Sequence, residues 1–235
     1  MNMDYFLPGV DQQLKVLFDH FDPEDKTILL IGVNTGMIAK MFTKFGAFSV
    51  IIMVDDYEAL LSTRLSVKKE TAISVRMMNF ENTDFNDSSF DLVYAQASIS
   101  NKSRNKIIKE IIRILKTGGY FCVGENISLN NNPPIFVKEI WNSSNISPLF
   151  IKDIGKYYSE WKFEIVFRKD LSYTLKKFYK MSRSLLQEKS ESLTGEEKNY
   201  YKKLIKKISH ESNTYLKLGG DKYIGFFMLI LRTTA

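Results

Sequence analysis

Two glycines and an aspartate follow apolar runs at a spacing that suits nucleotide binding. The first run, residues 27–32, ends at Gly32 and leads through a short turn to Gly36, and the second, residues 48–54, ends just before Asp55. In an open α/β sheet, glycines after the first strand let the backbone approach a ligand, and a carboxylate after the second strand can accept hydrogen bonds from ribose hydroxyls. The pattern therefore predicts a strand, turn, helix and strand that bind an adenosine-containing cofactor.

The turn itself disfavours a dinucleotide. A dinucleotide fingerprint that starts at Gly32 also needs glycines at positions 34 and 37, where this chain has Asn34 and Met37. Asparagine tolerates a positive φ angle better than most residues, so Asn34 can still occupy a tight turn. We therefore expect a cofactor other than NAD.

The elements that must position these residues alternate along the first half of the chain. Apolar runs of strand length are separated by stretches with helical periodicity. This alternation is typical of an α/β fold, here a doubly wound, seven-stranded, mostly parallel sheet of the Rossmann-like kind. The predicted strands are residues 27–32, 48–54, 72–77, 90–95 and 119–124, and the predicted helices are 11–21, 35–45, one from residue 57, and 102–115.

The second half is less regular. At 235 residues the chain suits a single domain, 1–235, with a helix within 1–24 and a helical insertion at 171–219. A run of three asparagines and two prolines predicts a loop. The expected elements are this loop at 130–134, a helix at 148–158, a strand at 161–167, helices at 172–187 and 194–210, and a last strand at 223–232.

Four segments resemble the class I S-adenosylmethionine-dependent methyltransferases. They are the glycine turn, the acidic loop that begins at Asn79, the Phe-Asp-Leu-Val strand that begins at Phe90, and the Arg-Ile-Leu-Lys-Thr-Gly-Gly turn before the fifth strand. The chain departs from the family pattern at Leu30, where an acidic residue is usual, and at Asn34, where glycine is usual. The resemblance is close over residues 25–126 and looser elsewhere.

The resemblance implies S-adenosylmethionine as the cofactor and assigns its contacts. The turn would face the methionine moiety through Gly32, Asn34 and Gly36. Asp55 would hold the ribose hydroxyls, and Asp56 would flank the adenosine. The remaining expected contacts are Asn79 at the adenine amino group, Phe80 on the adenine ring or simply in the core, and Gln96 at the methionine end.

The acceptor side carries fewer signals. Residues 5–9 and the layout of the second half resemble small-molecule methyltransferases related to phosphoethanolamine and sarcosine enzymes. This resemblance implies an N-terminal lid within 1–24, an insertion at 171–219 that covers the acceptor pocket, and Tyr5 as a lid residue or acceptor contact. The phosphobase enzymes place Arg-Asp after the fourth strand and a histidine four residues beyond that aspartate. This chain has Gln96-Ala97 and Asn101 instead, which disfavours phosphoethanolamine. The sequence does not rank the other candidates for the acceptor pocket, Tyr157, Tyr158, Tyr173 and Glu125.

Composition disfavours several other classes of protein. One cysteine argues against a disulfide framework, and with two histidines it makes a zinc site improbable. The longest apolar run, 224–231, is too short to span a bilayer. We therefore expect a cytoplasmic protein that holds no metal and does not bind a membrane.

The positive charge is concentrated in one segment. Residues 176–207 hold ten Lys and Arg against four Glu, while the net charge of the whole chain is +6. Residues such as Leu204 and Ile208 would share one helical face and the lysines the other, which is the ordinary amphipathic pattern of a solvated helix.

Three functions fit these observations. The leading one is a methyltransferase that uses S-adenosylmethionine to methylate a nitrogen or oxygen of a small-molecule acceptor. The second is a methyltransferase-like protein that binds the cofactor without turnover, which Leu30, Asn34 and the lack of an acid–base pair would explain. The third, an RNA-directed methyltransferase that uses the basic helices, ranks last because no Asn/Asp-Pro-Pro-aromatic motif follows the fourth strand.

Overall fold

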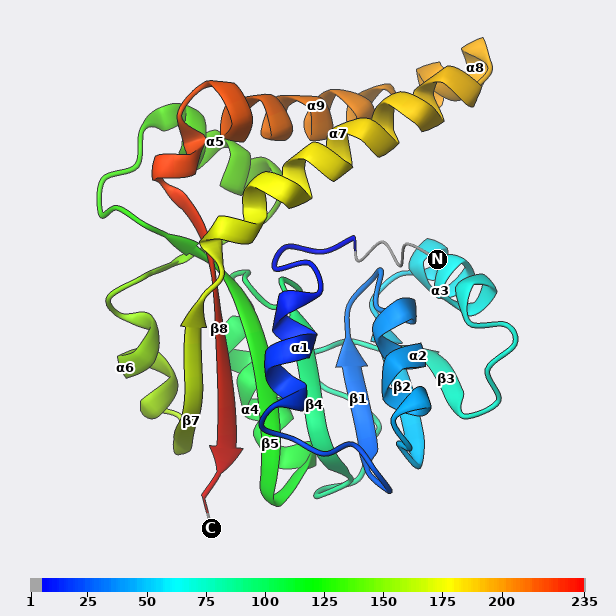
Figure 1. Cartoon of the computed structure of the whole chain (residues 1–235), viewed down its shortest axis with the longest axis vertical. Coiled ribbons are helices and arrows are strands. Elements are labelled where there is room, and N and C mark those ends of the chain that lie inside the picture. Colours follow the sequence, from blue (N-terminus) through cyan, green and yellow to red (C-terminus); the bar gives the residue numbers. More distant parts are fainter. Residues whose placement is uncertain (1–5, 235) are drawn as a thin grey trace.

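The computed structural model describes residues 6–234, except for the side chains of five residues between 189 and 200. Its centre is one sheet in the order β3-β2-β1-β4-β5-β8-β7, with β6 paired to β5 (Figure 1). All pairings among the first five strands are parallel, and β8 runs antiparallel to β5 and β7. The prediction of a mostly parallel Rossmann-like sheet is thus confirmed. The strands are β1 Thr27–Ile31, β2 Ser49–Val54, β3 Ile73–Met77, β4 Phe90–Gln96, β5 Leu115–Ser128, β6 Leu149–Phe150, β7 Phe163–Asp170 and β8 Ile224–Thr233.

Helices cover both faces of the sheet. The core on one face combines residues of α1, α2 and α3, and the core on the other combines residues of α4 and α6. Two short 3-10 turns, η1 Ser172–Thr174 and η2 Gly220–Lys222, join the last strands to the helices between them. The helices are α1 Gln12–Phe18, α2 Gly36–Lys44, α3 Tyr57–Ser66, α4 Arg104–Ile114, α5 Ile135–Ser143, α6 Ile154–Ser159, α7 Leu175–Ser192, α8 Gly195–Tyr200 and α9 Lys202–Lys217.

The central strand β1 shows why the apolar runs of this sequence form a parallel sheet. Its four residues Ile28 to Ile31 are each at most 1% exposed. Ile28 and Leu30 enter the core with α1 and α2, whereas Leu29 and Ile31 enter the core with α4. Side chains alternate across a strand, so a strand covered on both faces needs a continuous apolar run.

The helices α7 and α9 pack side by side and extend over the end of the sheet, with α8 at their far tip (Figure 1). They lie between β7 and β8 in the chain. We call this unit the hairpin, residues 175–217. The sequence predicts one helix over 194–210, but the structure has two, because the helical path breaks at Tyr201 between α8 and α9.

Two other predicted elements differ from the structure. Residues 148–158 do not form one helix: Leu149–Phe150 pairs with β5, and only Ile154–Ser159 is helical. The predicted loop at 130–134 is present, but α5 follows it at once, with Pro134 at the N-cap and the apolar residues Val137, Ile140 and Trp141 buried. Proline is well tolerated at the start of a helix, so the two prolines mark the start of α5 as well as the turn before it.

Within residues 6–234, no helix combines the length and the apolar character needed to cross a bilayer.

Gly124 of β5 offers a test of the packing between α1 and the sheet. A Cβ at this position would lie 2.0 Å from Oε1 of Gln13 and 2.4 Å from the ring of Phe226. We expect Gly124→Ala to lower the free energy of unfolding by about 1–3 kcal/mol, the usual cost of overpacking a core. Urea unfolding followed by circular dichroism measures it.

Gly195→Ala is the matched control, because nothing lies within 4 Å of a Cβ placed there. We expect this variant to be neutral or slightly more stable. Equal stability of the two variants would contradict the packing of α1 described here.

Candidate functional site

The predicted binding residues lie at the carboxyl ends of β1, β2, β3 and β4, and Gln96 is itself the last residue of β4. Strand order reverses between β1 and β4, since the chain moves outward through β2 and β3 and then returns to the other side of β1. In open α/β sheets, ligands bind at such a switch point, outside the carboxyl ends of the strands.

The glycine turn has the backbone conformation that the sequence predicts. Gly32 has φ 109° and Asn34 has φ 60°. The hydroxyl of Thr35 donates to the carbonyl of Gly32 at 3.0 Å, which fixes the turn before α2 begins. Asn34 therefore occupies a left-handed position, which asparagine tolerates better than most residues.

Both Gly32 and Gly36 lie close to side chains from other parts of the chain. A Cβ at Gly32 would lie 2.6 Å from the Cβ of Ser98, and a Cβ at Gly36 would lie 2.5 Å from Oγ of Ser66. A Cβ at Gly36 would therefore displace the hydroxyl of Ser66 where α2 packs against α3.

A cavity of about 570 Å³ brings three of the predicted residues together, Asp55, Asn79 and Phe80. We call it the first cavity. Its volume lies in the range of small-molecule sites. The sequence did not indicate the other polar residues on its wall, which include Glu81, Asn101, Lys102, Ser103 and Asn145. These come from loops whose positions only the tertiary structure shows.

The neighbouring aspartates have different roles. Asp55 is exposed after β2, and its carboxylate makes no hydrogen bond or ion pair with the described residues, so both oxygens can accept from a ligand. Asp56 is the N-cap of α3 and accepts from the backbone N–H of Ala59 at 2.8 Å. Asp56 does not line the first cavity, and its cap explains why a carboxylate stands there.

Asn79 and Phe80 form part of a turn after β3. The side-chain oxygen of Asn79 accepts from the backbone N–H of Glu81 at 2.8 Å, which leaves its amide donors for other partners. Phe80 is 8% exposed and belongs to the core with α4, although it also lines the first cavity. Phe80 is therefore core and cavity wall at once.

The wall of the first cavity is held against α4 by charged groups. Glu81 accepts from the hydroxyl of Ser103 and pairs with Lys106 at 2.9 Å. The hydrogen bond from Ser103, and then that from Lys106, lowers the pKa of the Glu81 carboxyl. These contacts join the loop after β3 to the loop before α4.

A second clamp holds the acidic loop of residues 83–87. The guanidinium of Arg113 contacts Glu110 and Asp87, each at 2.6 Å, and Thr83 donates to Glu110. Burial would raise the pKa of the Glu110 carboxyl, but hydrogen bonds from Arg113 and Thr83 outweigh it and lower that pKa to about 2. The carboxylate is therefore ionised throughout the neutral range.

A buried ion pair supports the loop after β4 from beneath. Arg104 and Glu125 meet at 2.8 Å, with side chains that are 8% and 0% exposed. The hydroxyl of Tyr158 donates to Glu125 at 2.5 Å, and the hydroxyl of Ser100 donates to its other oxygen. Burial, and then the charge of Glu125, raises the pKa of the Tyr158 hydroxyl far above its usual value. Arg104 also donates to the carbonyl of Ser147.

Two of the candidates for the acceptor pocket belong to this network. Glu125 and Tyr158 bind each other inside the core with α4 and α6, and neither lines a described cavity. Tyr157 donates to Asn105 on the same side of the sheet. Their contacts are those of a structural network that positions the loop of residues 98–103.

Gln96 also has contacts that differ from its expected role. It is 2% exposed, and its side-chain oxygen accepts from the hydroxyl of Tyr94 at 2.6 Å. Its amide donates to the carbonyls of Pro8 and Val10, at 2.6 and 3.0 Å. Gln96 therefore holds the N-terminal segment of residues 6–10 over the end of β4. It lines neither the first cavity nor the larger cavity beside Asn34.

A second cavity, of about 740 Å³, lies between the hairpin and the glycine turn. Asn34 and Glu58 line it from the sheet side, and Phe6 lines it from the N-terminal segment. Tyr201, Leu204, Ile205 and Ile208 line it from the hairpin, so the face of α9 that the sequence groups as apolar is the face on this cavity. Tyr5, the predicted catalytic residue, lies outside the described residues.

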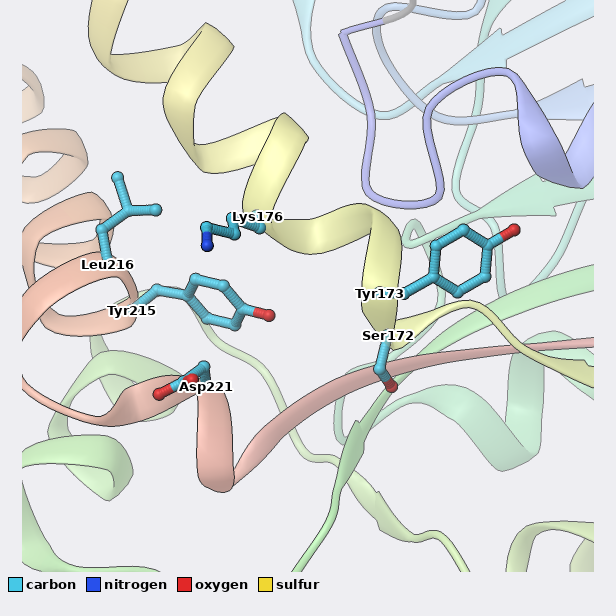
Figure 2. A pocket seen from close by; sticks show the side chains of 6 residues that line it. All are labelled: Ser172, Tyr173, Lys176, Tyr215, Leu216 and Asp221. Atoms are coloured by element: carbon cyan, nitrogen blue, oxygen red, sulfur yellow. The ribbon is translucent and has the colours of Figure 1, made fainter.

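A third, smaller cavity of about 350 Å³ lies near η1 and η2, beside β7 and β8. Figure 2 shows Lys176, Tyr215 and Asp221 on one side of it and Tyr173 pointing away from them. Burial, and then the charges of Asp221 and Asp170, raises the pKa of the Tyr215 hydroxyl to about 12. This cavity is distant from the switch point in the sheet order, and the acceptor candidate Tyr173 lies here and not in the second cavity.

Other catalytic chemistry has little support in the described residues. Burial raises the pKa of the Cys122 thiol to about 12, against a hydrogen bond from Gln13 that lowers it, so this cysteine is a poor nucleophile. Within residues 6–234, no three His, Cys, Asp or Glu side chains are grouped so that they could hold a metal ion.

The comparisons with known proteins agree with this fold. Residues 29–123 match the family model described as a methyltransferase domain. This segment runs from Leu29 in β1 to Val123 in β5, and it includes the glycine turn and the residues of the first cavity that follow β2 and β3. Over these 95 of its 235 residues, the chain is similar to a methyltransferase domain.

Two curated relatives are sterol 24-C-methyltransferases. The protein from Aspergillus fumigatus is 30% identical over 118 residues, which are 47% of this chain and 31% of that protein. The protein from Eremothecium gossypii is 32% identical over 108 residues, which are 44% and 29% of the two chains. The chain thus spans about a third of the length of the curated relatives it matches.

Solved structures share the fold over nearly the whole chain. A phosphoethanolamine N-methyltransferase of Haemonchus contortus, solved with phosphomonomethylethanolamine and S-adenosylhomocysteine, has a TM-score of 0.78 at 17% identity and covers 96% of this chain and 53% of its own. A protein described as a sarcosine dimethylglycine methyltransferase of Galdieria sulphuraria has a TM-score of 0.75 at 14% identity, over 94% and 83% of the two chains. The cyclase SpnF has a TM-score of 0.76 at 16% identity, over 96% and 81%.

The ion pair beneath the first cavity gives a test of the site's support. Arg104→Met would leave the Glu125 carboxylate buried without its cationic partner. We expect the free energy of unfolding to fall by about 3–5 kcal/mol, the usual cost of breaking a buried pair. Urea unfolding at neutral pH measures this change.

Lys106→Met is the control, since it breaks the pair with Glu81 in which Lys106 is 74% exposed. Such exposed pairs contribute little to stability. If Arg104→Met were no more damaging than this control, the network would not hold the loop after β4.

Proposed function

We propose that the protein transfers a methyl group from S-adenosylmethionine to a nitrogen or oxygen of a small-molecule acceptor. The observation that carries the proposal is the first cavity, which joins a free carboxylate after β2, Asp55, to Asn79 and Phe80 after β3. These groups fit an adenosine, with the carboxylate on the ribose and the amide at the base.

The methionine end of the cofactor fits the glycine turn. The hydroxyl of Ser98 lies against Gly32 and is buried with no hydrogen-bond partner among the described residues. A buried hydroxyl without a partner is costly, so a polar group bound there would satisfy it. Gly32, Asn34 and Ser98 would hold the amino acid moiety, with Leu30 buried in the core where the family usually has an acidic residue.

Bound there, S-adenosylmethionine would supply an electrophilic methyl group, and the chain would supply alignment and exclusion of water. The second cavity includes Asn34 of the glycine turn, and so it is our candidate for the acceptor site. The hairpin, within the 171–219 insertion, would cover it, and the N-terminal segment would close it beside α7, where Phe6 packs on Phe178 at 6.1 Å between ring centroids. A neutral amine needs no strong base, and the second cavity has no histidine among its described lining residues.

Two alternatives remain open to experiment. A cofactor-binding protein without methyl transfer is compatible with the fold, because a cyclase is among the similar structures and a fold does not specify a reaction. An RNA-directed enzyme would need the lysines of α9, which lie opposite the residues on the second cavity. We favour a cytoplasmic location, because the single cysteine is free and buried.

Calorimetry with S-adenosylmethionine and with NAD tests the cofactor, and we expect binding of the former only. Asp55→Ala should weaken binding by about 1.5–3 kcal/mol, the scale of a hydrogen bond to a charged group. Asp153→Ala is the control, because Asp153 is exposed and makes no side-chain cap at the start of α6. Preference for NAD, or unchanged affinity of Asp55→Ala, would contradict the assignment.

Deletion of residues 1–8 tests the lid. It removes Leu7 from the core and the Pro8 carbonyl from Gln96, and with them one wall of the second cavity. We expect release of S-adenosylhomocysteine, assayed with a panel of small amines and alcohols, to fall more than cofactor affinity does. Tyr5→Ala separates the expected role of Tyr5 from that of Phe6 to Pro8. Full activity of the truncated protein would exclude a lid function.

A further inference from the structure

The second cavity is mainly apolar. Phe178, Leu185 and Leu186 of α7 face Leu204, Ile205 and Ile208 of α9 across it. Several of these side chains keep exposed surface, and Leu204 is 51% exposed. Contact of an apolar ligand with such surface is favourable at about 25 cal/mol per Å² buried. The cavity volume of about 740 Å³ suits a drug-sized or lipid-like molecule.

The charged groups on the wall of this cavity all have one sign. Among the lining residues that the structure describes, the charged ones are Glu58 and Glu211, and none is Lys or Arg. Glu211 accepts from the hydroxyl of Ser144, while Glu58 is exposed in the first turn of α3 and has no such partner among the described residues. The local charge is thus opposite to the net charge of +6 on the whole chain.

A further polar atom on the wall lacks a partner. The hydroxyl of Ser212 is buried without a hydrogen-bond partner among the described residues, and Ser212 is 1% exposed. It lies in α9 beside Glu211 and lines the cavity. A ligand with a polar group would satisfy this hydroxyl, which a purely apolar ligand would not.

We propose that the second cavity binds a lipophilic amine, a molecule with an extended apolar body and a basic nitrogen. The apolar faces of α7 and α9 would hold the body. Glu58 would attract the ammonium form toward Asn34 and the glycine turn, because both residues line the same cavity. The assignment of this molecule as the methyl acceptor rests on the proposed function, whereas its binding does not. Transfer would require the bound ammonium first to lose its proton to solvent, because only the neutral amine has the lone pair that attacks the methyl group.

The same wall disfavours a phosphorylated ligand. A phosphate in this cavity would meet two carboxylates and no described cation, and like charges in a partly dry site repel strongly. The net positive charge of the chain would favour anions in any non-specific binding. Tighter binding of an amine than of a phosphate would therefore result from the groups on the cavity wall and not from the net charge of the chain.

Calorimetry without cofactor tests the proposal with decylamine, decanol and decyl phosphate, which share one apolar body. We expect decylamine to bind about two- to fivefold more tightly than decanol, the scale of a partly exposed ion pair. It should bind at least about tenfold more tightly than decyl phosphate. Equal or tighter binding of decyl phosphate would overturn the proposal.

Two pairs of variants place the ligand. Glu58→Gln should reduce the ratio of the affinities for decylamine and decanol. Glu160→Gln, at the exposed C-cap of α6, should leave this ratio unchanged. Ile208→Ala should weaken both ligands about threefold or more through lost apolar contact, and Leu65→Ala, 72% exposed on α3, should not. If the two variants of each pair had the same effect on ligand affinity, the ligand would not bind in the second cavity as proposed.

Cofactor affinity measured on the same preparations separates this inference from the proposed function. Binding of S-adenosylmethionine with no binding of decylamine would overturn the inference and leave the proposed function standing. Binding of decylamine with no binding of S-adenosylmethionine would support the cavity and count against methyl transfer.

Discussion

The reversal of strand order between β1 and β4 is the constraint on which the rest of the structure depends. The chain leaves β1 for one face of the sheet and β4 for the other, because α2 and α4 contribute to opposite cores. The loops after these strands therefore diverge, and a crevice opens between them. Asp55 and Asn79 reach this crevice because β2 and β3 run parallel to β1 and end on the same side.

Most polar side chains around this crevice have their hydrogen-bond partners within the protein, and these contacts fix the walls of the crevice. The Arg104–Glu125 pair and the Glu81–Ser103 contact hold one wall, and Gln96 holds the N-terminal segment on the other side. Among the described residues, four buried side-chain atoms lack a hydrogen-bond partner, in Gln13, Ser98, Ser212 and Thr214. The hydroxyls of Ser98, against Gly32, and of Ser212, on the second cavity, lie at the proposed sites, as does the exposed carboxylate of Asp55 on the first cavity. Buried polar groups are normally paired, so these atoms indicate where ligand atoms would lie.

Much of this arrangement could be predicted from the sequence, because strand ends are local features. The apolar runs locate β1 to β4, and the residues just after them include Asp55 and Asn79. Gln96 and Gly36 show the limit of such reasoning. Their partners, the Pro8 carbonyl and Ser66, are set by how distant segments pack, and no spacing near either residue indicates this.

The acceptor side was harder to predict for the same reason. Glu125 and Tyr158 look like candidates in the sequence, since a carboxylate and a phenol can do acid–base chemistry. In the structure they bind each other and Arg104 inside the core. The amphipathic pattern of α9 does indicate which face is apolar, but only the hairpin with α7 shows that this face lines a cavity beside Asn34.

A crystal structure with S-adenosylhomocysteine would test the central claim most directly. The account predicts the ribose on Asp55, the adenine between Asn79 and Phe80, and the amino acid moiety beside Gly32 and Ser98, with the sulfur directed toward the second cavity. The adenosine in the cavity lined by Lys176 and Tyr215, or the sulfur directed away from the hairpin, would contradict it.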